Sequence, residues 1–214
     1  LQFAKQHQKY IGQIGLATQR SSVVAWDSRT GKALSPVLSW QDRRAADWLM
    51  SFVPHQDMIR QHTGLRLSPH YGVSKLHWLR KNIPAVIEAE KQQHLALGPL
   101  ASFILFHLLE GNRFVVDHAN AARTLLWNIT SCDWDDTLLK LFAIPRQYLP
   151  QCCPIRYHYG YLKNHSIPIT AVNGDQTAAL HGTAEVNLDQ VWVNMGTGAF
   201  ILKSTDQQLI RHTK

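Results

Sequence analysis

Two short segments near the end of the chain carry the residue types that phosphoryl transfer needs. In GDQTAALHG (174–182), Asp175 follows an apolar run and precedes an Ala-rich stretch. In MGTGAF (195–200), the turn formed by Gly196, Thr197 and Gly198 offers bare backbone that a phosphate can approach. A carboxylate at the carboxyl end of a strand, followed by such a turn, is typical of a site that deprotonates a hydroxyl and holds a phosphate.

Each segment also has an ordinary interpretation. An Asp at a helix start satisfies orphan backbone N–H groups, so Asp175 is equally expected as a cap. A Gly-x-Gly turn between two strands is commonly a hairpin connection. The positive end of a helix dipole keeps a neighbouring carboxylate ionised, so capping and proton acceptance are compatible, and both interpretations stay open.

The elements around these segments indicate an α/β fold. IPITAV (167–172) predicts a strand that ends just before Asp175, and a helix is expected over 176–184. Residues 191–204 predict two strands around the Gly-Thr-Gly turn. Towards the amino terminus the pattern predicts a strand at 9–17, a hairpin at 21–34, and helices at 42–53, 74–82 and 134–142. The apolar run 95–109 predicts one buried helix with Pro99 in its first turn. This order favours a mixed β-sheet flanked by helices.

Size and charge limit the classes of protein that fit. The chain has 214 residues, 45% of them hydrophobic and 17% charged, which is typical of a globular protein with one large core or one domain and the start of another. We place the boundary near Glu185, giving domains 1–184 and 185–214. The net charge is +7, but Lys and Arg are scattered, so we expect no nucleic-acid partner and favour a protein that handles phosphates.

Cysteine and hydropathy patterns set the expected environment. The cysteines are Cys132, Cys152 and Cys153, an odd number without CxxC spacing, so neither a disulfide framework nor a zinc site is predicted, and they are interpreted as small buried side chains. No metal site is expected from the histidine spacing either. The longest apolar run falls short of the roughly 20 residues that span a bilayer, and no secretion signal is seen. We therefore expect a cytoplasmic protein that does not contact membranes.

Six blocks of the sequence, in order, resemble one known family. They are IGLATQRSSVVAWDSRTGKALSPVLSWQDRRA, IRQHTGLRLSPHYGVSKLHWL, VDHANAARTLLWNIT, DWDDTLLKLFAIPRQYLP, NGDQTAALHG and NMGTGAF. The chain is similar to the amino-terminal sugar-binding domain of the FGGY carbohydrate kinases. The resemblance implies the actin-like ATPase (ribonuclease H-like) fold. It also implies that the family's first strand and its Asp-Gly-Thr phosphate turn lie upstream of Leu1.

The resemblance implies roles for individual residues. Asp175 matches the general base and Gln176 its neighbour that contacts the substrate. Arg20 matches an arginine that binds substrate hydroxyls, while Trp40 and Phe200 match the aromatic walls of the sugar site. The turn at Gly196, Thr197 and Gly198 matches part of the phosphate-binding region.

Two positions depart from the members that phosphorylate glycerol. Ser21 stands in place of a glutamate and His70 in place of a tyrosine. Both side chains still bond hydroxyls, but the charge and shape of the pocket change, which favours another polyol or a longer ketose such as xylulose. Tyr71, next to His70, is an alternative pocket residue.

The implied function is transfer of the ATP γ-phosphate, with Mg²⁺, to a hydroxyl of a small polyol or ketose. We expect the isolated fragment to be inactive. We also hypothesise that apolar surface left by truncation makes the fragment self-associate. The alternative is a non-catalytic sugar sensor or scaffold with the same fold. The individual residues have alternatives too: Arg20 pairing with Asp27 or Asp42, Trp40 and Phe200 packing, and His70 lying on the surface.

Overall fold

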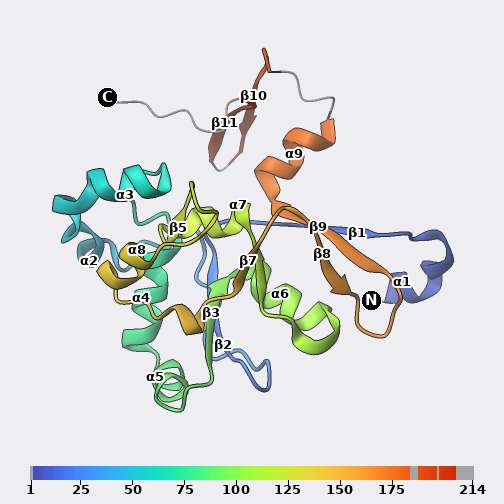
Figure 1. Cartoon of the computed structure of the whole chain (residues 1–214), viewed down its shortest axis with the longest axis horizontal. Helices are drawn as coiled ribbons and strands as arrows, with labels where there is room; N and C mark the ends of the chain where they lie inside the picture. Colours follow the sequence, from blue (N-terminus) through green and yellow to red (C-terminus); the bar gives the residue numbers. More distant parts are fainter. Residues whose placement is uncertain (1, 184–187, 197, 206–214) are drawn as a thin grey trace.

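The computed structural model describes residues 2–183, 188–196 and 198–205. Short strands alternate with helices along the chain, as Figure 1 shows. The strands are β1 (Ile14–Thr18), β2 (Val23–Asp27), β3 (Leu95–Pro99), β4 (Val115–Asp117), β5 (Trp127–Asn128), β6 (Asp133–Trp134), β7 (Gln151–Cys153), β8 (Arg156–Tyr161), β9 (Pro168–Gly174), β10 (Val191–Met195) and β11 (Ala199–Lys203).

The α-helices are α1 (Gln2–His7), α2 (Ala46–Met50), α3 (Gln56–Thr63), α4 (Gly72–Asn82), α5 (Pro84–Lys91), α6 (Leu100–Leu108), α7 (His118–Ala121), α8 (Asp136–Leu141) and α9 (Asp175–Thr183). The 3₁₀ turns are η1 (Gln8–Tyr10), η2 (Val53–His55), η3 (Glu110–Asn112), η4 (Ala122–Thr124) and η5 (Arg146–Tyr148). None of the described helices is long and apolar enough to cross a bilayer.

The strands pair in small sheets. β9 lies between β1 and β8, parallel to the first and antiparallel to the second. β4 pairs with β7 in parallel, while β2 with β3 and β10 with β11 are antiparallel. In the β1–β9 ladder Thr18 lies opposite Gly174, so both strands end at the same edge. Side chains that follow these two strands are therefore brought together, as is usual at the carboxyl ends of parallel strands.

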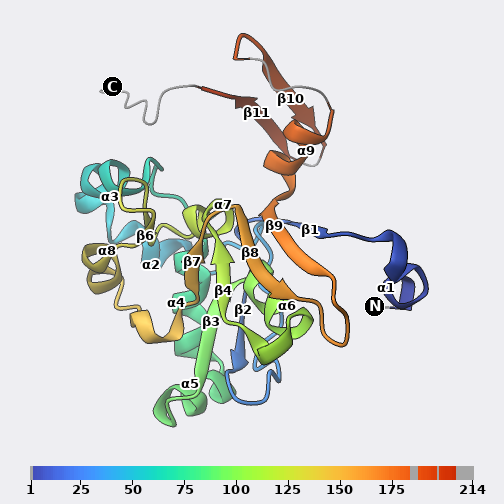
Figure 2. The same ribbon diagram turned by 45° about the vertical axis from the view of Figure 1, so that its right-hand side comes forward.

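Three apolar clusters hold the fold together. The largest joins β2 and β3 to helices α3, α4, α5 and α8, and a second packs α6 against β4, β8 and β9. The third surrounds Trp26, which is fully buried with its ring edge-on to Phe103, Phe106 and Phe114 at centroid distances of 5.4, 6.0 and 5.3 Å. Helix α9 and the hairpin β10–β11 stand at one end of the molecule, apart from the helical half formed by α2 to α5 (Figures 1 and 2).

Local signals explain where several elements begin. The Asp117 side chain accepts a hydrogen bond from the amide of Asn120 at the start of α7, and Asp135 does the same for α8 with the amide of Leu138. Both are N-cap contacts, which satisfy amides that have no partner within the helix.

The prediction for the apolar run 95–109 was partly wrong. Its first five residues form strand β3, which pairs with β2 in an antiparallel ladder, and Pro99 lies at the N-cap position of α6 instead of in the first turn of one long helix. A continuous apolar run satisfies a buried strand and a buried helix equally well. The pairing partner, which lies far away in sequence, decides between them.

Other expectations for the fold are confirmed with shifted ends. The helix expected at 74–82 runs from Gly72 to Asn82, and the strands around the Gly-Thr-Gly turn are β10 and β11. The helix expected over 42–53 is shorter and is followed by η2. The hairpin at 21–34 contains β2 and Gly31 at φ 75°, but its return is an isolated bridge between Trp26 and Ala33 instead of a strand. Backbone hydrogen bonds from Asp27 to the Lys32 carbonyl and from Leu34 to the Ala25 carbonyl flank this bridge. The proposed boundary between 184 and 185 lies outside the described residues.

The cysteines are free thiols. Cys153 is buried, Cys152 is half-buried and Cys132 is exposed, so the expectation of buried side chains holds fully for one of them.

Candidate active site

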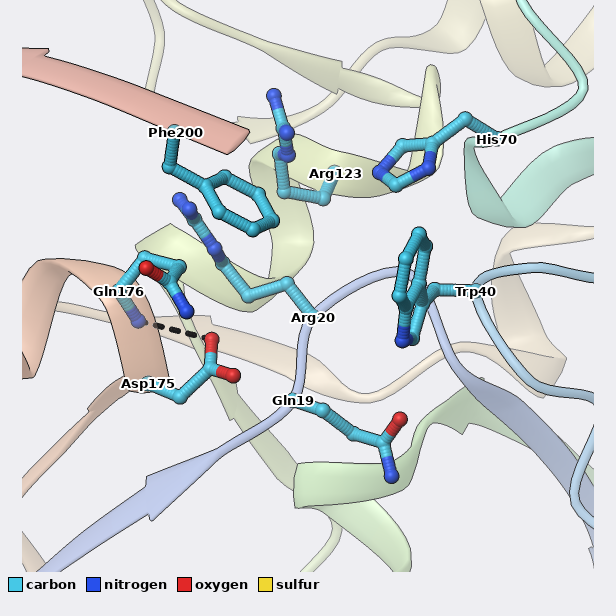
Figure 3. Close-up of a pocket in the computed structure, with 8 residues that line it drawn as sticks. All are labelled: Gln19, Arg20, Trp40, His70, Arg123, Asp175, Gln176 and Phe200. Atoms are coloured by element: carbon cyan, nitrogen blue, oxygen red, sulfur yellow. Dashed lines mark hydrogen bonds between the residues drawn. The ribbon is translucent and has the colours of Figure 1, made fainter. Parts of the chain in front are cut away.

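The carboxyl-terminal edge of β1 and β9 opens onto a small pocket with a cavity volume of about 30 Å³. Side chains from six separate segments of the chain line it, and Figure 3 shows them converging from β11, α9, η4 and three loops, one of which follows β1. The lining residues are Gln19, Arg20, Trp40, His70, Arg123, Asp175, Gln176 and Phe200. The structure therefore brings together Asp175 and five of the six residues expected to contact substrate.

Asp175 is the first residue of α9, directly after β9 ends at Gly174. Its Oδ1 accepts a hydrogen bond from the backbone amide of Gln176 at 2.8 Å, and the side chain is exposed. Among the described residues no other group bonds the carboxylate, so Oδ2 is free to accept a proton from a ligand. This bond goes to the next amide along the chain, whereas an N-cap side chain bonds the amide of the second or third helical residue, so it is not the expected N-cap contact. The open Oδ2 leaves the carboxylate available in the way a general base requires.

Arg20 lies across Gly174. A Cβ atom built on Gly174 would stand 2.2 Å from Arg20 Cδ and 2.7 Å from its Nε, so only glycine leaves space for this arginine. The alternative in which Arg20 pairs with Asp27 or Asp42 is wrong, because Asp27 bonds Arg29 and His94 while Asp42 bonds Arg44. Arg20 instead extends into the pocket above Asp175 (Figure 3).

Trp40 and Gln19 are held by one hydroxyl. Ser22 Oγ accepts a hydrogen bond from the Trp40 amide at 3.1 Å and donates one to Gln19 Oε1 at 3.0 Å. Trp40 is half-buried and lies outside the apolar clusters, so the interpretation of it as a core residue is wrong. Because Gln19 Oε1 accepts the hydrogen bond from Ser22, the side-chain N–H groups of Gln19 remain for a ligand.

His70 packs against the pocket side of Trp40. The ring centroids are 5.6 Å apart and the ring planes meet at 63°, an edge-to-face contact. The preceding loop is fixed by the buried ammonium group of Lys75, which donates hydrogen bonds to the carbonyl oxygens of Pro69, His70 and Tyr71. Burial, followed by the positive charges of Arg123, Lys75 and Arg20, lowers the pKa of His70 to about 4. At neutral pH the imidazole is therefore uncharged, with one donor and one acceptor nitrogen.

The hairpin β10–β11 supplies the remaining wall. Phe200 from β11 lines the pocket, and Gln176 Oε1 accepts a hydrogen bond from Asn194 Nδ2 of β10 at 2.7 Å. A Cβ on Gly198 would lie 3.3 Å from the Phe200 ring and 3.7 Å from Trp40, so the turn reaches both aromatic walls. The Gly196 amide donates to Gly198 O at 3.0 Å, and a Cβ at Gly196 would meet nothing within 4 Å. Thr197 lies outside the described residues.

Ser21 and Tyr71 do not line the pocket. Ser21 is buried with φ 65°, and within the described chain its hydroxyl has no hydrogen-bond partner. The ring of Tyr71 instead lies under the guanidinium of Arg123, 5.1 Å from ring centroid to Cζ, and against His70.

Arg123 and Gln19 are lining residues to which the sequence alone gave no role. Gln19 is the neighbour of Arg20 in the TQRSS block, and Arg123 lies in the VDHANAARTLLWNIT block. Arg123 reaches the pocket from η4, which follows the four-residue helix α7. Its membership of a block that resembles the kinases was the only available signal, because its partner Tyr71 is distant in sequence.

Comparisons with known proteins identify the family and the fold of the chain. The pattern of the FGGY family of carbohydrate kinases, N-terminal domain, matches residues 2–182. A glycerol kinase from Mycoplasma capricolum subsp. capricolum is 37% identical over 210 residues, which cover 94% of this chain and 42% of the relative. A glycerol kinase from Plasmodium falciparum, whose crystal structure contains ADP, superposes with a TM-score of 0.84 at 28% identity, covering 94% of this chain and 42% of that one.

A xylulose kinase from Lactobacillus acidophilus has the same fold, with a TM-score of 0.75 at 21% identity over 92% of this chain and 42% of that one. The fold is thus the mixed α/β, actin-like fold of the sugar kinases. The chain belongs to the FGGY family of carbohydrate kinases. It spans about two-fifths of the length of the curated relatives it matches.

Proposed function

We propose that the protein transfers the γ-phosphoryl group of ATP to a hydroxyl of a small polyol or ketose, with Asp175 as general base. The observation that supports this most strongly is the free Oδ2 of Asp175 in a pocket shared with Arg20, Gln176 and two aromatic walls. Polar groups suit hydroxyls and the flat rings of Trp40 and Phe200 suit a carbon chain, which together are what a sugar presents.

The reaction needs few protein groups. The substrate hydroxyl gives its proton to Asp175 Oδ2 as its oxygen attacks the γ-phosphorus. A new O–P bond forms, the bond from the γ-phosphorus to the bridging oxygen breaks, and ADP leaves with that electron pair. Positioning and charge neutralisation carry most of the rate enhancement in such transfers. Arg20, beside Asp175, is placed to hold the attacking oxygen and offset developing negative charge.

The nucleotide and the metal ion are proposed on different grounds. The exposed backbone at Gly196, where a side chain would meet nothing within 4 Å, leaves room for a phosphate group. The described residues contain no cluster of three or more His, Cys, Asp or Glu side chains that could hold a metal ion. In kinases Mg²⁺ usually binds through one or two carboxylates together with the phosphates of the substrate, so we propose that it enters with ATP, and no step above is routed through it.

The test is Asp175→Asn in the full-length protein, with Asp57→Asn as the matched control. Asp57 is also exposed in the first turn of a helix, α3, but lines a different hollow. We expect kcat to fall by roughly 10² to 10⁴ in Asp175→Asn, the usual contribution of a general base, while sugar binding persists. Asp57→Asn should keep wild-type kcat.

Normal kcat in Asp175→Asn would remove Asp175 as the base. A wild-type protein that binds sugars but never transfers phosphate would instead support the sugar-sensing alternative. A panel of polyols and ketoses, followed by the rise in melting temperature that a bound ligand produces, identifies the substrate.

A further inference from the structure

Two guanidinium groups enter the pocket with their hydrogen-bond donors unused by other described residues. Arg20 comes from the loop after β1 and Arg123 from η4, and both line the same space. Within the described chain neither group forms a hydrogen bond or an ion pair. In Figure 3 both side chains extend in the same direction, towards the part of the pocket lined by Phe200.

The pocket has an excess of positive charge. Among the described lining residues Asp175 is the only carboxylate, against two guanidinium groups, and the pKa of His70 is too low for it to be charged at pH 7. Burial lowers the pKa of Arg20, and repulsion by the positive charge of Arg123 lowers it further. Ser21 beside Arg20 is neutral. An anion between the two guanidinium groups would relieve this repulsion.

The free donors of Arg123 are well placed for an oxyanion. The guanidinium lies over the ring of Tyr71, 5.1 Å from its centroid, and this contact fixes the plane of the group. Its Nε is buried and has no hydrogen-bond partner among the described residues. Planar guanidinium groups bind carboxylate and phosphate oxygens through pairs of parallel hydrogen bonds, and a buried donor without an acceptor is costly.

We propose that Arg20 and Arg123 together form an oxyanion site inside the sugar pocket. The proposal rests on the proposed function, because it names the chemistry that this pocket recognises. Two sources supply such an oxyanion: the carboxylate of a polyhydroxy acid, bound as substrate in place of a neutral polyol, or the phosphoryl group during its transfer. In either case Arg123 acts by direct contact with the anion, and Asp175 faces the hydroxyl.

The experiment measures binding to the full-length protein without nucleotide. The ligands are gluconate, its neutral counterpart sorbitol and inorganic phosphate, each at matched ionic strength. The variants are Arg123→Gln, Arg123→Lys and the charge control Arg66→Gln, since Arg66 is exposed and lines a separate hollow with Gln56, Asp57 and Arg60. Thermal denaturation without ligand shows that each variant folds.

We expect gluconate or phosphate to raise the melting temperature of the wild type and of Arg66→Gln. Arg123→Gln should weaken that binding at least tenfold. Arg123→Lys should have an affinity between those of Arg123→Gln and the wild type, because lysine keeps the positive charge but cannot form the paired, parallel hydrogen bonds of a guanidinium group. Preference for gluconate over sorbitol assigns the carboxylate source. Binding of phosphate alone, with kcat lowered and the sugar KM unchanged in Arg123→Gln, assigns the phosphoryl source.

Equal binding by Arg123→Gln and the wild type, or equal loss in Arg66→Gln, would overturn the oxyanion site. So would a failure of every anion to bind. Because the binding measurements use no nucleotide, anion binding through Arg123 in a protein without transferase activity would leave this site standing while the kinase proposal failed.

Discussion

Thr18 Oγ1 donates a hydrogen bond to Asn120 Oδ1, 3.3 Å away, across 102 residues of sequence. Thr18 is the last residue of β1, two positions before Arg20, and Asn120 lies in α7, three positions before Arg123. Asn120 is in turn bonded to Asp117 through both its backbone amide and its side-chain amide. One buried amide thereby joins the two parts of the chain that carry the guanidinium groups.

Replacing Thr18 by Val should loosen this connection without a large change in shape. We expect a loss of about 1 to 2 kcal/mol in unfolding free energy, since the buried Asn120 oxygen loses its donor. We also expect a higher sugar KM, because Arg20 is no longer held in register with Arg123. Thr18→Ser should restore both.

Thr63→Val is the matched control. Thr63 is also buried, and its hydroxyl donates to the Ile59 carbonyl within α3, away from the pocket. It should lose stability and keep the wild-type KM. A similar rise of KM in both variants would show that the Thr18 contact is structural only.

Gly174→Ala should displace Arg20. The new Cβ would overlap its Cδ, and the backbone at Gly174 does not require glycine, so the cost falls on the position of the arginine. We expect sugar affinity to weaken at least tenfold, with unfolding free energy changed by less than about 1 kcal/mol. Calorimetry with the preferred sugar checks the affinity.

Gly182→Ala controls for the substitution itself. A Cβ there meets nothing within 4 Å, and the residue lies inside α9. Alanine should raise the unfolding free energy by up to about 1 kcal/mol and leave sugar affinity unchanged. Full affinity in Gly174→Ala would mean that Arg20 finds its position by another path.

Asp117 should make stability depend on pH. Burial raises its pKa from 3.8 to about 6, in spite of the hydrogen bonds from Asn120. The unfolded chain therefore loses this proton at lower pH than the folded protein, so the contribution to stability is complete below pH 3.8 and disappears as pH rises through 6. In denaturant titrations, the difference in unfolding free energy between the wild type and Asp117→Asn should fall by about 2 kcal/mol from pH 4 to 7.

The control is Asp27→Asn. Burial would raise the pKa of Asp27, but backbone hydrogen bonds from Arg29 and Thr30 outweigh it and lower the pKa to about 2. Its titration falls mostly below pH 4, so the corresponding difference should stay nearly constant between pH 5 and 7. A flat profile for Asp117→Asn would contradict the raised pKa.

Lys75→Met should destabilise the loop that carries His70. The buried ammonium group donates hydrogen bonds to three carbonyl oxygens. With methionine, the carbonyls of Pro69 and Tyr71 keep only the long bonds from Ser74 Oγ at 3.4 Å, and that of His70 loses this donor, at a cost of about 3 kcal/mol. Lys81→Met, at an exposed position of the same helix, should change the unfolding free energy by less than about 0.5 kcal/mol. Equal effects, measured by denaturant titration, would mean that the three bonds contribute nothing net.

The sequence was most informative where local signals are strong. The strand before Asp175, the helix after it and the hairpin around the Gly-Thr-Gly turn each depend on neighbouring residues, so they were predicted nearly as the structure has them. The pocket residues came mainly from the resemblance to sugar kinases, because Arg20, Trp40 and Phe200 are each also interpretable as surface or packing residues.

The sequence was least informative where a distant partner decides. Strand β3 was not separated from α6, because β2 selects the strand. Arg123 was missed because its approach depends on Tyr71 and on the cap at Asp117. Neither contact has a signature within a short window of sequence.

The wall formed by Phe200 lies on the same hairpin as Gly198, where an added Cβ would meet both that ring and Trp40. A ligand that displaces the Phe200 ring is therefore expected to displace Gly198 as well. If the proposed function holds, we expect a sugar that is too large to misalign the phosphate donor as well as to crowd the pocket.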